Sequence, residues 1–171
     1  RVLNRIIRWT PDSVEYEADP RQCERFIEEV LGTTGANAVV TPATVLSADE
    51  LKKEEPLPEE RNTAYRGASA RGNYLAADRP DIQFATKEIC WWMAAPTNLS
   101  EAALKRLARY LKGEARLVYE YTKQSCDHIY VYSDTDWAGC PRTRKSITGG
   151  IIMLGRHTIK TWSSTQAGGP K

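Results

Sequence analysis

The hydrophobic positions of this chain follow two spacings, one typical of strands and one typical of helices. Alternating or β-branched runs predict strands at residues 1–9, 13–18, 116–122, 128–133, 149–154 and 157–163. A spacing of three to four predicts helices at residues 20–31, 63–77, 80–93 and 100–112. The order of these elements predicts an α/β (α+β) fold, with an N-terminal strand pair and helices followed by an antiparallel sheet.

Local signals place several boundaries of these elements. Asp19 is a natural N-cap, Pro20 suits the first helical position, and Gly32 ends that helix. Gly155 and Arg156 lie between two strand patterns and predict a tight hairpin turn. We expect the strands at 116–122 and 128–133 to be adjacent.

Residues 33–61 show little periodicity and include a polar, charged stretch. This composition predicts a solvated connection, with one helical turn after Ser47. An acidic protein-binding tail is the alternative interpretation of the same stretch.

The composition limits the classes of protein to which the chain can belong. Of its 171 residues 41% are hydrophobic and 27% charged, which predicts a packed core rather than disorder. A net charge of +2 is too small to indicate nucleic-acid binding by itself. No apolar run has transmembrane length, and no signal-peptide pattern is present. Because the first residue is Arg1, we expect a piece of a longer product or a missing start.

The cysteines are four in number and scattered, without a C-x-x-C pair. This arrangement argues against a structural zinc site and predicts reduced thiols in a reducing intracellular compartment. Two disulfides are the alternative.

The strand pattern at residues 128–133 runs into two acidic residues, Asp134 and Asp136. Alternation places Asp134 on one face with Tyr130 and Tyr132, where the strand gives way to a turn. A carboxylate at such a point can hold Mg²⁺ through oxygen, although aspartate at a strand end is also ordinary turn chemistry.

Two groups of basic residues are candidates for contacts with nucleic-acid phosphates. Lys105, Arg109 and Lys112 share one face of a predicted helix, and Arg142, Arg144 and Lys145 cluster in the loop after Asp136. Each group is equally well explained as an ordinary solvated surface.

Trp91 and Trp92 form a dense apolar end to the third predicted helix. Core packing is one interpretation, and a partner-docking surface is the other. A Ser/His/Asp set can be written from Ser133, His157 and Asp134, but no nucleophile-elbow pattern supports it.

An ordered series of motifs resembles the Pol polyprotein of Ty1/copia-type retrotransposons. The series, from residue 74 to residue 164, is YLA, RPDI, FA, LARYLKG, YSDTDWAG, RKSITGG, IIMLG and IKTWSS. The first part resembles the segment after the reverse transcriptase palm, and the second resembles the opening of the ribonuclease H domain. The resemblance implies an incomplete ribonuclease H-like sheet and three regions: 1–62, the end of a reverse-transcriptase-like region with a polar linker; 63–113, a helical connection; and 114–171, a truncated ribonuclease H-like domain.

The resemblance also implies a chemistry and shows where the chain departs from it. In that family Asp134 would be the first carboxylate of a two-Mg²⁺ ribonuclease H centre, with Asp136 a weak supplement. No Asp or Glu follows Asp136, so the set of carboxylates is incomplete and Mg²⁺ would bind only if the site were completed. We therefore expect a segment of the polyprotein that is inactive by itself. The alternatives are a repurposed, non-catalytic subunit of a larger assembly, and binding of RNA–DNA hybrid without cleavage.

Overall fold

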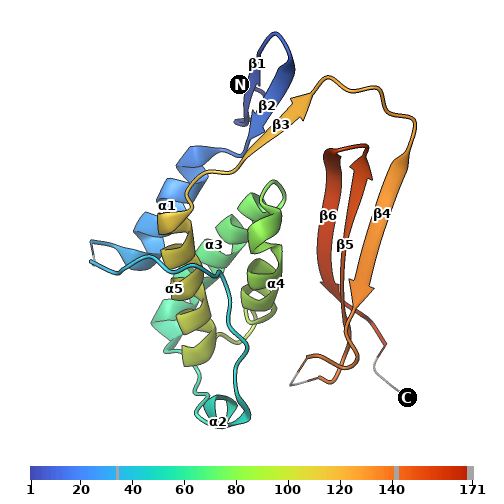
Figure 1. Ribbon diagram of the computed structural model, residues 1–171. Coiled ribbons are helices and arrows are strands. Elements are labelled where there is room, and N and C mark those ends of the chain that lie inside the picture. Colours follow the sequence, from blue (N-terminus) through green and yellow to red (C-terminus); the bar gives the residue numbers. More distant parts are fainter. Residues whose placement is uncertain (34, 141–142, 169–171) are drawn as a thin grey trace. The chain divides into compact units, whose positions relative to one another are not determined.

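The computed structural model describes residues 1–33, 35–140 and 143–168, with both helices and sheets. In chain order the elements are β1 (Ile6–Trp9), β2 (Ser13–Glu17), α1 (Pro20–Leu31), α2 (Ala48–Leu51), α3 (Glu59–Ala76), η1 (Pro80–Ile82), α4 (Gln83–Trp91), α5 (Asn98–Gly113), β3 (Val118–Thr122), β4 (Ile129–Thr135), β5 (Ile147–Leu154) and β6 (His157–Thr165) (Figure 1). Residues 1–7 and 17–118 form one compact unit, and residues 8–16 with those from 119 onward form a second. The predicted α+β class is confirmed, whereas the predicted three-region division stays a prediction.

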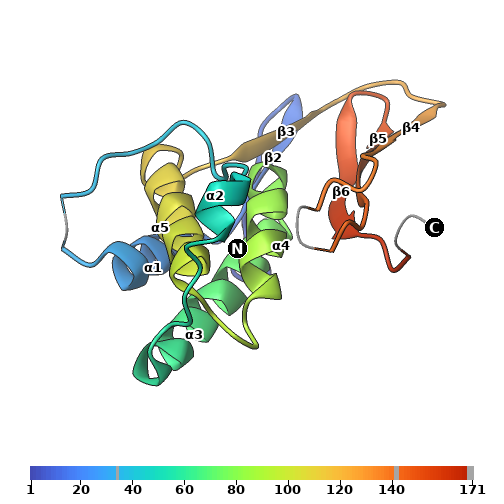
Figure 2. The same cartoon turned by 90° about the horizontal axis from the view of Figure 1, so that it is seen from below.

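The first unit is a helical bundle in which α1, α3, α4 and α5 surround a shared core (Figure 2). Phe26 of α1, Ile89 of α4, and Leu107 and Leu111 of α5 are at most 1% exposed. Their burial removes a large apolar area from water, which is the main stabilising contribution to such a bundle. This core fixes the inner face of α5 and leaves its basic side chains outside.

The ends of α1 follow the local signals in the sequence. The Asp19 carboxylate accepts a hydrogen bond from the Arg21 N–H, Pro20 occupies the first turn, and Gly32 ends the helix at a φ of 57°. The positive φ of Gly32 lies in the left-handed region, where residues that carry a Cβ have a higher conformational energy than glycine. The predicted boundaries of α1 are confirmed.

Three other helices differ from prediction at their starts. α3 begins at Glu59 rather than residue 63, and its first turn carries two acidic residues, which the helix dipole favours. The helix expected from Pro80 begins as the 3₁₀ turn η1 and becomes α-helical at Gln83. α5 begins at Asn98, two residues early, because Thr97 and Ser100 form a capping box.

The sequence predicted a solvated connection before α3, but the structure shows that part of this connection is packed. The expected helical turn is present as α2, capped by Ser47 and Glu50. Beyond it, however, Leu57 is buried, and its N–H donates to the Pro96 carbonyl at 2.9 Å. Thr97 also donates to the Glu54 carboxylate at 2.8 Å, so the segment is tied to the start of α5.

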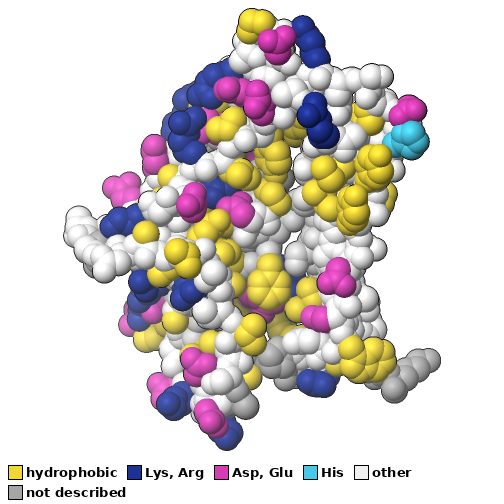
Figure 3. All heavy atoms as spheres, in the orientation of Figure 1, with side chains coloured by type: hydrophobic (Ala, Val, Ile, Leu, Met, Phe, Trp, Pro, Cys, Tyr) yellow, Lys and Arg dark blue, Asp and Glu magenta, His cyan; other side chains and the backbone are white. Residues whose placement is uncertain are grey.

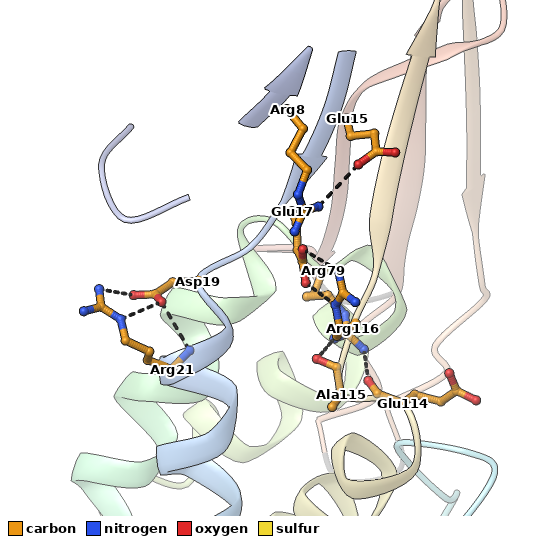
Figure 4. Close-up of polar contacts among 9 residues, drawn as sticks. All are labelled: Arg8, Glu15, Glu17, Asp19, Arg21, Arg79, Glu114, Ala115 and Arg116. Carbon is orange, nitrogen blue, oxygen red and sulfur yellow. Dashed lines mark hydrogen bonds and ion pairs between the residues drawn. The ribbon is translucent and has the colours of Figure 1, made fainter. Parts of the chain in front are cut away.

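Charged side chains are paired where the chain leaves α5 (Figure 4). Arg79 is 3% exposed; it donates to both Asp81 carboxylate oxygens and to the carbonyls of Glu114 and Ala115. Burial alone would lower the pKa of Arg79, but the Asp81 carboxylate outweighs it and raises the pKa. Arg116 makes two hydrogen bonds, of 2.6 and 2.8 Å, to the buried Glu17 carboxylate. These pairs anchor the end of α5 within the first unit.

The sheet that contains β3 corrects two predictions. β3 pairs with β2 in the order β1-β2-β3, whereas β4 belongs to another sheet, so strands 116–122 and 128–133 are not neighbours. The Lys123 N–H donates to the Asp12 carbonyl and extends the pairing of β3 with the N-terminal hairpin. The first strand begins only at Ile6, because Leu3 and Asn4 take positive φ angles and form a turn.

The second sheet has the order β4-β5-β6 and is antiparallel throughout. The predicted hairpin turn is confirmed, since Gly155 has a φ of 56° and Leu154 pairs with His157. Gly150 lies opposite Trp162, whose indole ring covers the position that a Cβ would occupy. The large ring therefore fills the space that this glycine leaves on the sheet.

Within the second unit, aromatic rings link the two sheets. Tyr121 of β3 meets His157 of β6 edge to face, with ring centroids 5.2 Å apart. The Tyr121 hydroxyl also donates to the Thr158 carbonyl at 3.1 Å. The Gln124 side chain donates to the Leu154 carbonyl at 2.8 Å, so both ends of the β5–β6 hairpin turn are held from the β3 side.

The two phenylalanines of the chain give a matched test of the core. We expect Phe26→Ala to lower the free energy of unfolding by about 3–4 kcal/mol, because the fully buried ring leaves a cavity. Phe84 is 40% exposed, and Phe84→Ala should cost less than about 1.5 kcal/mol. Urea denaturation measures both, and equal losses would contradict the assigned core.

The Asp19 cap predicts a pH dependence of stability. Burial alone would raise the pKa of Asp19, but hydrogen bonds from Arg21 and its charge hold the pKa below the usual value. The stabilisation from the ionised carboxylate is therefore present above about pH 4 and is lost as the pH falls through the lowered pKa. Asp19→Asn keeps a capping side chain, so its stability deficit should be constant near neutral pH and shrink in acid. Denaturation curves from pH 3 to pH 7 test this; a deficit that grows in acid would contradict it.

Candidate functional site

Asp134 lies at the end of β4, opposite Gly149 of β5. Its side chain is exposed and shares a strand face with Tyr130 and Tyr132, as the alternation predicted. Gly149 has no side chain to cover the carboxylate, and a Cβ there would meet only one backbone oxygen within 4 Å. Among the described residues none forms a hydrogen bond or ion pair with the Asp134 carboxylate, so both oxygens remain available to a cation.

Asp136 has a different role in the structure. Its Oδ1 accepts hydrogen bonds from the Ile147 N–H at 2.7 Å and from the Gly139 N–H at 3.2 Å. These bonds hold the loop between β4 and β5, which is the turn chemistry that aspartate often supplies. Its predicted role as a supplementary metal ligand stays a prediction, and one of its oxygens is already engaged.

A divalent-metal centre requires several oxygen ligands around one point. Over residues 1–33, 35–140 and 143–168, no three His, Cys, Asp or Glu side chains converge in a way that could hold a metal ion. The described residues therefore offer Asp134 as a single ligand and do not fit a two-Mg²⁺ centre by themselves.

The basic row on α5 contacts the chain's own backbone and side chains. Arg109 donates to the Asn37 carbonyl at 2.7 Å, and Lys112 donates to the Ala36 carbonyl at 2.9 Å. Lys105 instead pairs with Glu101 one turn earlier on the same helix. Two of the three predicted phosphate-binding side chains thus hold the segment after α1 against α5.

A third basic residue in this contact was not predicted as a site residue. Arg106 donates to the Thr41 hydroxyl at 2.6 Å, next to the Arg109 and Lys112 contacts. The available signal was Thr41-Pro42, which marks an ordered turn rather than a free linker. Together Arg106, Arg109 and Lys112 clamp residues 36–41.

The loop after Asp136 carries the other predicted basic group. Arg144 has a φ of 55°, and its N–H donates to the Cys140 carbonyl at 2.9 Å. The Lys145 carbonyl accepts from the Cys140 N–H at 3.0 Å, so the backbone of Cys140 is bonded to that of both Arg144 and Lys145. Arg142 lies outside the described residues. Contacts of Arg144 and Lys145 with phosphate stay predictions.

The adjacent tryptophans divide between core and surface. Trp92 is half-buried and packs against the helical core, whereas Trp91 is 47% exposed. Their ring centroids are 5.7 Å apart. Both interpretations made from the sequence thus have a structural counterpart, one for each indole, and partner docking stays a prediction.

The structure agrees with the argument from the sequence against a catalytic set of Ser133, His157 and Asp134. Ser133 and Asp134 pair with Gly150 and Gly149, whereas His157 pairs with Leu154 at the opposite end of β5. Four residues of strand separate the two ends, or about 13 Å, and the His157 ring instead contacts Tyr121. No proton transfer between these side chains is possible.

A wide hollow of about 480 Å³ lies beside the start of β4, lined by residues such as Cys126, His128 and Arg156. This hollow was not predicted from the sequence, although the polar run between β3 and β4 was its signal. The Cys126 thiol contacts the His128 carbonyl at 3.2 Å, a backbone contact that does not activate sulfur.

All four cysteines lie in the described part of the chain, and none of them is in a disulfide there. Burial raises the pKa of the Cys23 thiol to about 11, so it is protonated and unreactive at neutral pH. Among the described helices, none is both long and apolar enough to cross a bilayer.

Comparison with known proteins identifies relatives of this chain. The retrovirus-related Pol polyproteins from transposons RE2 and RE1 of Arabidopsis thaliana are 34% and 35% identical to it over 148 residues. Each match covers 85% of this chain but 10% of the polyprotein, so the chain spans about a tenth of the length of these relatives. An uncharacterized mitochondrial protein of the same species is 31% identical over 144 residues, which is 82% of this chain and 58% of that protein.

No family model and no solved structure matches the chain. The Pol matches nevertheless cover most of its length and agree with the ordered series of motifs between residues 74 and 164. The chain belongs to the family of retrovirus-related Pol polyproteins of copia-type retrotransposons.

Proposed function

We propose that this chain is the part of a retrotransposon Pol polyprotein that connects reverse transcriptase to ribonuclease H, and that it is not catalytic by itself. In this proposal it supplies Asp134 as one carboxylate of a ribonuclease H centre that further residues of a longer product complete. The observation that carries the proposal is the exposed Asp134 carboxylate, which has no hydrogen-bond or ion-pair partner among the described residues and lies at the strand end.

The chemistry of hybrid cleavage explains why one carboxylate is not enough. Two Mg²⁺ ions activate the attacking water and stabilise the leaving oxygen, and their combined charge requires several carboxylates. Asp136 is engaged in its turn, and the sequence after it contains no Asp or Glu. This chain therefore positions one ligand and the strands around it, and the remaining ligands come from elsewhere.

A second proposal is a non-catalytic subunit of a larger protein assembly. The exposed Trp91 indole, beside the half-buried Trp92, supports it because exposed tryptophans are enriched at protein interfaces. Size-exclusion chromatography of native extract tests this proposal. Elution with larger complexes, lost in a Trp91→Ala variant, is expected, and elution as a 19.2 kDa monomer would contradict it.

Hybrid binding without cleavage has less support, because two members of the α5 basic row already bind backbone carbonyls. Phosphate contacts by these side chains would compete with the bonds that hold residues 36–41. We therefore propose that Arg109 and Lys112 have a structural role, which is to hold residues 36–41 against α5.

The ribonuclease H proposal predicts a contrast between this chain and a longer Pol product that contains it. The 171-residue chain should give no Mg²⁺-dependent cleavage of the RNA strand of a hybrid. In the longer product, Asp134→Asn should lower cleavage by more than about 100-fold, since even changes around metal ligands cost 10–100-fold. Asp127→Asn is the matched control, because Asp127 is exposed and contacts His128, and it should leave cleavage unchanged. Cleavage by the 171-residue chain that Asp134→Asn abolishes would overturn the proposal.

The structural assignment of the basic row predicts the effect of Arg109→Ala. Loss of the Asn37 contact should lower the free energy of unfolding by about 1 kcal/mol and speed amide exchange at residues 36–41. Arg144→Ala should cost less than about 0.5 kcal/mol. Hydrogen exchange and denaturation measure these effects. Weaker, salt-dependent hybrid binding by Arg109→Ala at unchanged stability would instead favour a phosphate-binding role.

A further inference from the structure

A polar network joins the three strands of the second sheet at the end where Asp134 lies. The Gln166 side-chain amide donates to the Thr148 hydroxyl of β5 at 2.8 Å and to the Thr135 hydroxyl of β4 at 3.0 Å. The Thr135 hydroxyl in turn donates to the Ile147 carbonyl at 3.1 Å. Because Gln166 comes directly after β6, one side chain connects the ends of all three strands.

The backbone around this network is bonded at the same place. The Gln166 N–H donates to the Ser146 carbonyl at 2.8 Å, and the Asp136 N–H donates to the Ile147 carbonyl at 3.1 Å. The Ile147 N–H donates to the Asp136 carboxylate at 2.7 Å. The backbone just beyond Asp134 is therefore fixed to the start of β5, and the end of β6 is fixed to the same segment.

The network and the Asp134 carboxylate lie on opposite faces of the sheet. Alternation places the Thr135 side chain on the face opposite to that of Asp134, and Thr148 lies directly across from Thr135. On the other face Gly149, which has no side chain, lies across from Asp134. Figure 3 shows acidic side chains exposed at this end of the sheet. The hydrogen bonds therefore hold the strand end without occupying the carboxylate.

We propose that Thr135, Thr148 and Gln166 are positioning residues for the Asp134 carboxylate. This inference rests on the proposed ribonuclease H function and extends it to side chains that do not themselves bind the ion, because they lie on the other face. A strand end that moves holds its carboxylate in the productive place for only part of the time. The apparent affinity for an ion falls in proportion to that fraction, so bonds that order the strand end favour Mg²⁺ binding.

The surroundings of the network favour positioning over general stabilisation of the fold. Thr135 and Gln166 are exposed and Thr148 is partly buried, so their bonds add little to the apolar burial that stabilises a folded chain. Residues that support a metal ligand without touching the ion nevertheless change metal affinity or activity by about 10–100-fold in other enzymes. Loss of the network should therefore change the order around Asp134 more than the stability of the whole chain.

Hydrogen exchange of the 171-residue chain tests the ordering of the strand end. Thr148→Val removes the hydroxyl that accepts from Gln166 and keeps the shape of the side chain, whereas Thr148→Ser keeps the hydroxyl. The Asp136 amide should exchange about three- to tenfold faster in Thr148→Val, as for the loss of one hydrogen bond, and near the unchanged rate in Thr148→Ser. Thr158→Val, at the opposite end of the sheet, is the matched control and should leave this amide unchanged. Equal exchange in Thr148→Val and the unchanged chain would overturn the proposal.

The Mg²⁺ dependence of cleavage by the longer Pol product tests the effect on the ion. In Thr148→Val and in Gln166→Leu, the Mg²⁺ concentration for half-maximal cleavage should rise by about three- to tenfold. The rate at saturating Mg²⁺ should stay near that of the unchanged product, because excess ion restores the ordered state. A loss of stability alone would lower the saturating rate and leave the Mg²⁺ dependence as it was, and that result would refute a positioning role.

The two proposals fail in different ways. If Asp134→Asn leaves cleavage by the longer product unchanged, the ribonuclease H proposal is wrong, and the positioning role is wrong with it. If Asp134→Asn abolishes cleavage but Thr148→Val does not change the Mg²⁺ dependence, only the positioning role is wrong.

Discussion

The helical unit depends on the pairing of one buried cation. Arg79 lies almost wholly out of water, where an unpaired guanidinium would be very unfavourable. Its partners are the Asp81 carboxylate and two carbonyls just beyond α5, and the Tyr110 hydroxyl donates to the same carboxylate at 2.9 Å. Removal of one partner of such a buried pair typically costs 3–5 kcal/mol. The direction in which the chain leaves α5 is therefore set by electrostatics as well as by apolar packing.

Elements defined by local chemistry were predictable from the sequence. Asp19 with Pro20, the Ser47 turn and the Gly155 turn each follow from residues within four positions of one another. The choice of partner for β3 was not predictable in this way. Its alternation fits either neighbouring strand, and the decision depends on contacts across more than a hundred residues, such as that of Lys123 with Asp12. Strand pairing of this kind leaves little trace in a local pattern.

The candidate site shows the same division. Strand alternation correctly placed Asp134 on an exposed face with two tyrosines, because that requires only a period of two. Helical spacing also placed Arg109 and Lys112 on the outer face of α5. It gave no information about the segment at residues 36–41 that binds them, since that segment has no periodicity of its own. A row of basic residues on a helix can therefore mark an intramolecular clamp instead of a nucleic-acid surface.

The pairing irregularity at Ile152 and Met153 has a mechanical consequence for the sheet. β6 has one extra residue at this point. The neighbouring residues Ile152 and Met153 of β5 pair with Lys160 and Thr158, which are two positions apart in β6. Sliding one strand along the other would move this extra residue out of place and turn every later side chain to the opposite face. The irregularity therefore opposes sliding of β6 along β5. It keeps the hairpin in a single alignment while the glycine-containing β5 would otherwise permit several.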